Sequence, residues 1–162
     1  MQNVRALTVC QPWATLIALG YKKMETRSKG FSWRGPLYIH AAKAFHYWQK
    51  ELCMDKPISD ILEVEGLAKE TPNGTPFWVF PLGAVVAVGR IAATHEVDSI
   101  KDTLTDQERA LGDYRSGRKA LELVDVTPVI PSVYCKGQQG LWIPSDEVIE
   151  KVRKEAKDDT FS

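Results

Sequence analysis

The segment from Ala84 to Thr94 constrains the fold most, because it carries the strongest strand signal in the chain. Its sequence, AVVAVGRIAAT, combines valine, isoleucine and threonine with small apolar residues, a composition typical of a strand. Gly89, in its middle, predicts a β-bulge or a sharp bend of the kind that curls a sheet into a barrel. We therefore expect a long, bent strand over residues 83–97.

Shorter strands and helices alternate along the rest of the chain. Further strands are predicted over 6–9, 23–27, 36–40, about 119–127 and 140–143. Helices are predicted over 11–19, 45–52, 59–66 and 105–111, and from Ser145 to the C-terminus. Strands separated by short helices predict an α+β fold, a small mixed β-barrel with flanking helices, and argue against a doubly wound sheet. We expect five to seven strands, closed or nearly closed, with the 11–19 helix beside them.

Several residues predict where helices start and stop. Pro12 suits the first turn of its helix, where a missing N–H costs nothing, and Gly20 suits the position just past its end. Ser59 is expected to cap the third helix. Thr105 and Glu108 form a capping box for the fourth. The sequence TPNGTP at 71–76 predicts a loop.

Size and composition indicate one globular domain over residues 1–162. Hydrophobic residues make up 44% and charged residues 26%, close to the globular average. There is no run of eighteen apolar residues and no signal-peptide pattern at the start. The cysteines Cys10, Cys53 and Cys135 form no CxxC pair and no zinc-type spacing. We therefore expect a cytoplasmic protein with reduced thiols, no metal, no cofactor and no membrane partner.

Positive charge is concentrated in the first part of the sequence, although the net charge is zero. Residues 1–50 contain eight Lys and Arg residues and one acidic residue, Glu25. The remaining residues contain thirteen Lys and Arg residues and twenty Asp and Glu residues. Such a segment can present a local field to an anion. The alternative is that these side chains are scattered over the folded surface.

A series of short motifs follows in order along residues 5–144. They are QPWA at 11–14 with Leu16, Ile17 and Gly20; Lys22, Glu25 and Arg27; RGPLYIHAAK at 34–43; LGAVVA at 82–87; GDY at 112–114 with GR at 117–118; and KGQQGLW at 136–142. Together they resemble the signature of the ASCH domain, a family of PUA-like β-barrels. The resemblance implies a small barrel with a cleft for RNA-related ligands, a motif-bearing core over 5–144 and a C-terminal helix over 145–162. Fold alone does not fix an activity.

The resemblance also implies possible chemistry. Some small bacterial relatives are amidohydrolases that act on N4-acetylcytidine with a lysine, a threonine and a carboxylate, and others are implicated in RNA cleavage or in nucleic-acid-binding coactivators. The matching lysine here is Lys22, but Glu25 stands where the threonine is expected. A carboxylate cannot replace a hydroxyl nucleophile without a change of mechanism. Thr26 is adjacent, but neighbouring strand residues point to opposite faces. Glu25 therefore disfavours the amidohydrolase reaction.

Lys22 and Glu25 are the candidate catalytic residues. Lys22 stands at the entry of a strand, where burial would lower its pKa and make it a base. The two side chains could form a proton shuttle or simply a salt bridge, which would contribute little. Glu25, beside Lys22 and Arg27, could also accept a hydrogen bond from the exocyclic amine of a base. Asp113 is a more distant candidate carboxylate.

The other candidates are ligand-binding residues. Arg27 and Arg34 suit phosphate contacts, because guanidinium groups bind phosphate in bidentate fashion. Trp13 and Trp33 suit base stacking, although Trp13 shares a helical face with core residues. His40, which ends a strand, is a ligand contact or a structural histidine.

Gln11, at the start of the first helix, is expected to converge with Lys22, Glu25 and Arg27 on one concavity. Trp142 is a further aromatic candidate that would be core in a closing strand. His40, His46 and Cys53 match no common metal spacing.

These residues predict a domain that binds RNA or a modified nucleoside. Its cleft would be lined by the N-terminal helix and the following strand, and its partner would be RNA or a nucleotide-like ligand. The alternative is a hydrolase of RNA metabolism, N4-acetylcytidine amidohydrolase-like or a ribonuclease, that uses Lys22 and Glu25. A protein-interaction domain is disfavoured by the basic, aromatic loop at 27–34.

Overall fold

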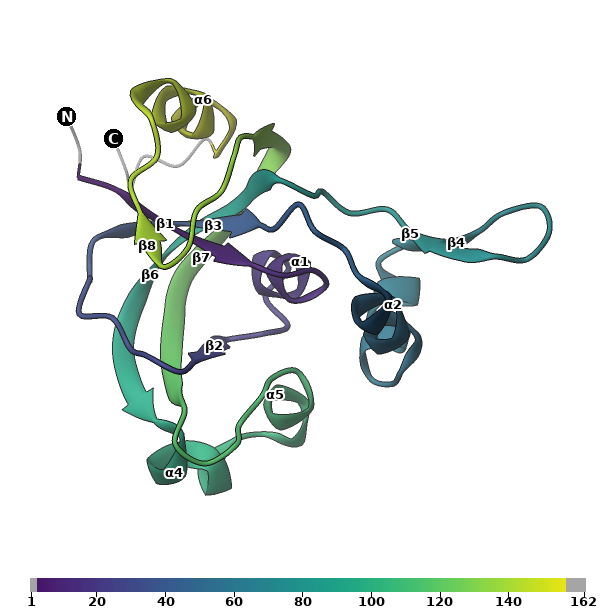
Figure 1. Ribbon diagram of the computed structural model, residues 1–162, viewed down its shortest axis with the longest axis horizontal. Helices are drawn as coiled ribbons and strands as arrows, with labels where there is room; N and C mark the ends of the chain where they lie inside the picture. The colour runs from purple at the N-terminus through teal and green to yellow at the C-terminus, as the bar shows by residue number, and fades with distance from the viewer. Residues whose placement is uncertain (1–2, 157–162) are drawn as a thin grey trace.

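The computed structural model describes residues 3–156 and contains one curled, six-stranded mixed sheet (Figure 1). The strand order is β2-β7-β6-β3-β1-β8. The strands are β1 Arg5–Val9, β2 Met24–Arg27, β3 Pro36–Ala41, β6 Ala84–Glu96, β7 Lys119–Tyr134 and β8 Leu141–Trp142. A separate hairpin pairs β4 Ala68–Glu70 with β5 Pro76–Trp78.

Short helices join and cover these strands. They are α1 Trp13–Ala18, α2 Tyr47–Met54, α3 Ile58–Val64, α4 Val97–Ile100, α5 Asp106–Ala110 and α6 Asp146–Ala156, with a 3₁₀ turn, η1, over Lys101–Thr103. No helix in the described part of the chain is long and apolar enough to cross a membrane.

The sheet is a half-barrel. Only β1 and β3 run parallel; the other neighbours are antiparallel. Within residues 3–156, β2 and β8 each pair on one side only, so the sheet keeps two edges. The α+β class and the predicted number of strands are confirmed, whereas the predicted closure is not complete. One edge is β8, a strand of two residues that pairs with β1, and the other is β2, which pairs with β7.

The predicted irregularity at Gly89 is confirmed. The pairing of β6 with β7 shifts register between Val88 and Arg90, on either side of this glycine. A Cβ at Gly89 would lie 3.0 Å from Val126 Cγ2 and 3.1 Å from the Val124 carbonyl oxygen. Glycine therefore allows β7 to approach where the two long strands bend.

Alternate residues of the strands build two cores on opposite faces of the sheet. Leu7 and Ile39 belong to a cluster with Ile17 of α1, whereas Tyr38 belongs to a cluster with Val152 of α6. This alternation follows from the two-residue period of a strand. The two helices consequently lie on opposite sides of the sheet (Figure 1).

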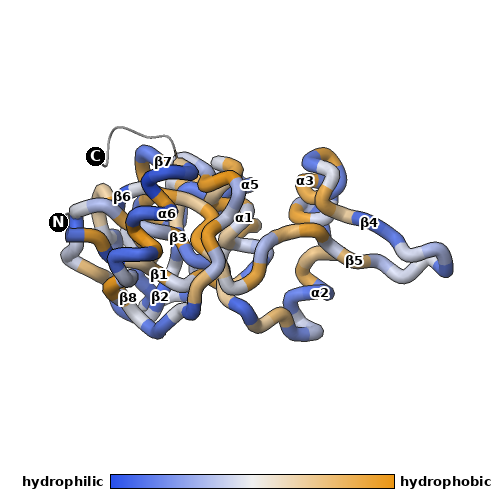
Figure 2. The backbone as a smooth tube through the Cα atoms, turned by 90° about the horizontal axis from the view of Figure 1, so that it is seen from above, coloured by the Kyte–Doolittle hydropathy of each residue, from blue (hydrophilic) through white to orange (hydrophobic). Residues whose placement is uncertain are grey.

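Residues 45–80 form an arm that projects from the sheet (Figure 2). The arm comprises α2, α3 and the β4–β5 hairpin, whose tip is the predicted loop at 71–76. A third cluster joins it to the sheet, because Leu16 of α1 and Leu111 pack with Ile58 and Leu62 of α3.

Some predicted boundaries need correction. The first helix is shorter than 11–19, with Pro12 in the N-cap position, and α3 is preceded by Pro57 and not capped by Ser59. Thr105 does cap α5, since its hydroxyl accepts a hydrogen bond from the Glu108 N–H at 3.1 Å. The Glu108 carboxylate does not complete the box, because it accepts a hydrogen bond from the backbone N–H of Lys23 at 2.6 Å.

Three features were not predicted. Residues 97–100 are helical, 68–78 form a hairpin, and β7 continues to Tyr134, beyond the expected end near 127. Pro128 and Pro131 conceal that extension, because proline normally argues against a strand. The last part of the predicted helix over 145–162, residues 157–162, lies outside the described residues.

Candidate functional site

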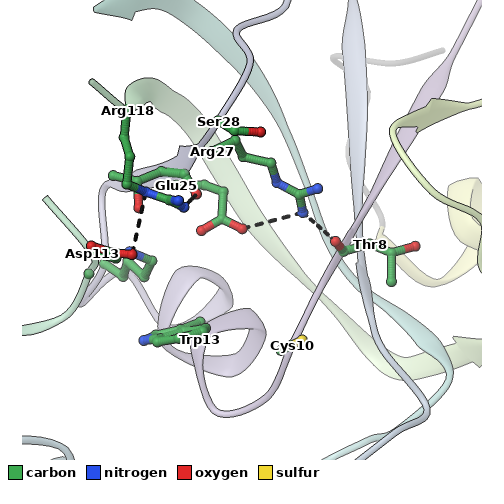
Figure 3. A pocket seen from close by; sticks show the side chains of 11 residues that line it. Thr8, Cys10, Trp13, Glu25, Arg27, Ser28, Asp113 and Arg118 are labelled. Carbon is green, nitrogen blue, oxygen red and sulfur yellow. Dashed lines mark hydrogen bonds and ion pairs between the residues drawn. The ribbon is translucent and has the colours of Figure 1, made fainter. Parts of the chain in front are cut away.

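A cavity of about 500 Å³ opens where β2 faces α1 and the segment that precedes β7 (Figure 3). We call it the central cavity. Its lining residues come from four stretches of the chain: Thr8, Cys10, Trp13, Lys22, Glu25, Thr26, Arg27, Ser28, Gly112, Asp113 and Arg118. The structure thus brings together Lys22, Glu25 and Arg27, and adds Trp13.

Strand β2 presents Glu25 and Arg27 on the same side, as the strand period requires. The Arg27 Nη2 lies 3.5 Å from the Glu25 Oε2 and also donates to the carbonyl oxygen of Thr8 on β1 (Figure 3). Arg27 therefore spans the gap between β2 and β1, and holds the Glu25 carboxylate beside a positive charge.

A second pair of opposite charges lines the same cavity. Arg118 Nε lies 3.5 Å from Asp113 Oδ2, and Arg118 Nη2 donates to the Thr26 carbonyl at 3.0 Å. Hydrogen bonds from Arg115 are the main reason why the pKa of Asp113 lies below its usual value. Arg118 was not identified as a site residue from the sequence; the only signal is its place in the GR motif.

Lys22 lies at the back of the central cavity and is 2% exposed. Its Nζ donates to the Leu111 carbonyl at 2.9 Å. Burial lowers the pKa of Lys22, and the nearby Glu25 and Glu108 carboxylates oppose part of that shift. The segment after α5 thus positions an amine that loses its proton more readily than an exposed lysine.

Trp13 supplies an aromatic wall. It lines the central cavity and also packs against Trp48 of α2, with ring centroids 5.8 Å apart. Cys10 is another lining residue, and burial together with Glu25 raises the pKa of its thiol. A raised pKa keeps this thiol protonated and poorly nucleophilic.

Gln11 does not line the cavity, contrary to expectation. It is fully buried, its Nε2 donates to the Pro81 carbonyl at 2.8 Å, and its Oε1 accepts from the Thr15 N–H at 3.0 Å. The side-chain amide of Gln11 therefore connects the start of α1 to Pro81, the residue that follows the arm.

His40 lies away from the central cavity, and its contacts are structural. Its Nε2 lies 2.8 Å from the Cys135 carbonyl oxygen, and its Nδ1 lies 3.2 Å from the Thr8 hydroxyl. The carbonyl can only accept, so Nε2 carries the proton and Nδ1 accepts from Thr8. Burial lowers the pKa of His40, which agrees with a neutral ring.

Trp33 and Arg34 also lie outside the central cavity. The Trp33 indole donates to the Pro36 carbonyl at 3.0 Å, and the Arg5 guanidinium lies 4.6 Å from its ring centroid. Arg34 donates to the carbonyls of Phe31 and Trp33 at 2.7 and 2.9 Å. Both residues therefore stabilise the loop before β3. Among residues 3–156, no three His, Cys, Asp or Glu side chains gather in a way that could hold a metal ion.

Comparison with known proteins identifies the fold. No family model and no curated protein matches the chain. Its structure is similar to crystal structures of ASCH from Zymomonas mobilis and of two mutants of that protein. The ASCH structure has a TM-score of 0.52 and 14% sequence identity, over 93% of this chain and 94% of that chain.

The two mutant structures agree with this result. A serine-to-alanine mutant has a TM-score of 0.51 and 14% identity, with the same shares of each chain covered. A tyrosine-to-phenylalanine mutant has a TM-score of 0.52 and 14% identity, over 94% of this chain and 98% of that chain. The chain therefore has the fold of an ASCH domain, as its motifs indicate.

Proposed function

We propose that the central cavity binds a nucleobase, either in RNA or in a modified nucleoside. The observation that carries this proposal is the Glu25 carboxylate, 10% exposed as a side chain, which lies beside Arg27 in a cavity walled by Trp13. A carboxylate accepts hydrogen bonds from the exocyclic amine of a base such as cytosine. An indole ring offers a face on which a base stacks.

The charges of the cavity favour a base over a free anion. Two carboxylates, Glu25 and Asp113, line it, and each is paired with an arginine. Carboxylates repel a bare phosphate, whereas they accept hydrogen bonds from N–H groups. Arg27 and Arg118 already contact these carboxylates and the carbonyls of Thr8 and Thr26, so their remaining N–H groups would donate to ring carbonyls, sugar hydroxyls or a flanking phosphate.

Calorimetric titration with cytidine and uridine tests this proposal. Wild-type protein should bind cytidine more tightly, because uridine has no exocyclic amine to donate to Glu25. The isosteric change Glu25→Gln should weaken cytidine binding by about tenfold and reduce the preference, since a hydrogen bond to a charged acceptor contributes about 1.5–3 kcal/mol. Glu63→Gln, at an exposed position on α3, is the matched control. Equal cytidine affinity in both variants would contradict the proposal.

A hydrolase is the second candidate, and the buried amine of Lys22 favours it. An amine with a lowered pKa can act as a general base, and Glu25 in the same cavity could orient a water. A carboxylate at position 25 would also repel the oxyanion of an amide hydrolysis intermediate. We expect turnover of N4-acetylcytidine to be slow and to rise in Glu25→Thr. Fast wild-type turnover, abolished in Lys22→Ala and Glu25→Gln, would instead establish a water-based hydrolase.

A further inference from the structure

Two more cavities continue the central cavity along the edge of the sheet. A middle cavity of about 580 Å³ shares Thr8, Arg27 and Ser28 with the central one. An outer cavity of about 770 Å³ shares Thr8, Gln138 and Gln139 with the middle one. Because neighbouring cavities have lining residues in common, the three lie next to one another, and we call this row of adjacent cavities the groove.

Charge changes along the groove. Both lining carboxylates, Glu25 and Asp113, belong to the central cavity. The middle cavity adds Lys29, and the outer cavity adds Lys43 and Lys136, with no acid lining either. These lysines are exposed, and within residues 3–156 none of the three forms an ion pair. The central cavity is therefore lined by charges of both signs, whereas the rest of the groove is lined by positive charges alone.

The base of the groove is formed by hydrogen-bonded side chains of β1, β3 and β8. The Trp142 indole donates to the Thr8 hydroxyl at 3.0 Å, and that hydroxyl donates to His40. Gly137 lies so close above them that a Cβ would be 2.5 Å from His40 Cε1 and 2.8 Å from the Thr8 Oγ1. Gly137 is thus packed against β1 and β3, and the residues that follow it, Gln138 and Gln139, line both the middle and the outer cavity.

We propose that the middle and outer cavities bind the phosphodiester backbone of a single-stranded polynucleotide whose base occupies the central cavity. This inference rests on the proposed function and names its ligand as an oligonucleotide, not a free nucleoside. Lys29, Lys43 and Lys136 neutralise successive phosphates, and the side-chain amides of Gln138 and Gln139 donate hydrogen bonds to them. A positive groove that follows the backbone is a general device for holding single strands.

Fluorescence anisotropy with labelled oligocytidylates of one, two, four and eight nucleotides tests the inference, beside calorimetry with unlabelled cytidine. Wild-type affinity should rise with length and fall with salt. In the double variant Lys43→Ala with Lys136→Ala, octamer affinity should fall roughly tenfold and the slope of log affinity against log salt should decrease by about 1.4, or about 0.7 for each lost phosphate contact. Cytidine affinity should stay unchanged. Lys69→Ala with Lys154→Ala removes two exposed lysines elsewhere and is the matched control.

Each outcome decides the matter. The inference is supported if the increase of affinity with oligonucleotide length is lost in the variant that combines Lys43→Ala with Lys136→Ala and is kept in the control variant. The inference is overturned if affinity still increases with length in the groove variant to the same extent as in the wild type. It is also overturned if the increase is lost equally in the control variant, or if the wild type shows no increase with length. If Glu25→Gln leaves cytidine affinity unchanged while the lysines still control the octamer, the base-binding proposal fails and the groove remains. Parallel octamers of RNA and DNA show whether the sugar is read, since both carry the same phosphodiester.

Discussion

Each hydrogen-bonding position of the His40 ring is already used by the fold. Nε2–H donates to the Cys135 carbonyl, and Nδ1 accepts from Thr8, whose hydroxyl in turn accepts from Trp142. Protonation would place a second N–H on Nδ1, where the Thr8 hydroxyl now donates. Burial and this network therefore both favour the neutral ring.

Stability should accordingly decrease on mild acidification. The folded pKa of His40 lies below the usual 6.5, so between these two values the unfolded chain binds more protons. The contribution of His40 to the free energy of unfolding is thus fully present above pH 6.5 and is lost as the pH drops toward the folded pKa. Urea unfolding at pH 7.5 and 5.5 checks this. His40→Gln should cost about 1 kcal/mol at pH 7.5 and should show a smaller loss between the two pH values. An identical loss in both proteins would disprove this role.

The sequence was informative for site residues that are close together in the chain and uninformative for distant ones. Glu25 and Arg27 meet in one cavity because a strand places alternate residues on one side, and Lys22 reaches it from the segment just before that strand. Arg118 reaches the same cavity from the position just before β7, and no local pattern in the sequence indicates that β2 pairs with β7. Gln11 was misplaced because its partner, Pro81, is 70 residues away.

At the scale of elements, β6 and β7 dominate the sheet, and Gly89 is the point at which their pairing adjusts. Gly89→Ala would place a Cβ 3.1 Å from a backbone oxygen of β7, which cannot rotate away. We expect a loss of about 1–3 kcal/mol in the free energy of unfolding, typical of overpacking. Ala92→Val, at an exposed position of the same strand, is the control and should be nearly neutral. Denaturant titration of both variants checks the difference, and equal stabilities would refute the packing argument.

Helices and strands were predictable where the hydrophobic periodicity of the sequence was strong. The prediction failed where that periodic pattern was short or interrupted. The apolar run of β6 and the amphipathic pattern of α6 specify their elements locally. The β4–β5 hairpin has three residues in each strand, too few for a period-two pattern. The end of β7 contains two prolines, yet pairing with β6 continues to Tyr134, because tertiary contacts override local propensity.

At the scale of the whole molecule, α1 joins the arm to the sheet. Ile17 packs on the sheet and Leu16 packs on the arm. Leu16→Ala should therefore lower the free energy of unfolding by about 2–5 kcal/mol. Leu19→Ala, next to the end of the same helix and 40% exposed, should change it by less than about 1 kcal/mol.

Hydrogen exchange shows which elements lose protection in the Leu16→Ala variant. Protection in α3 should fall more than protection in β6, because the change weakens the contact between arm and sheet. Uniform loss across the sheet, with α3 unaffected, would show that the arm is held by other contacts. The division into one domain over 1–162 stays a prediction until such data show whether arm and sheet unfold together.

The pairing of β1 with β8 brings the first and last strands of the described chain together, since the Trp142 indole donates a hydrogen bond to the Thr8 hydroxyl across 134 positions. During synthesis, all central-cavity residues up to Arg118 emerge before Lys136, Gln138 and Trp142. A nascent chain therefore contains every lining residue of the central cavity while the outer wall of the groove is still missing. Ribosome-associated or prematurely terminated chains that end before Lys136 would keep the lining residues of the central cavity but lack the wall formed by 136–140.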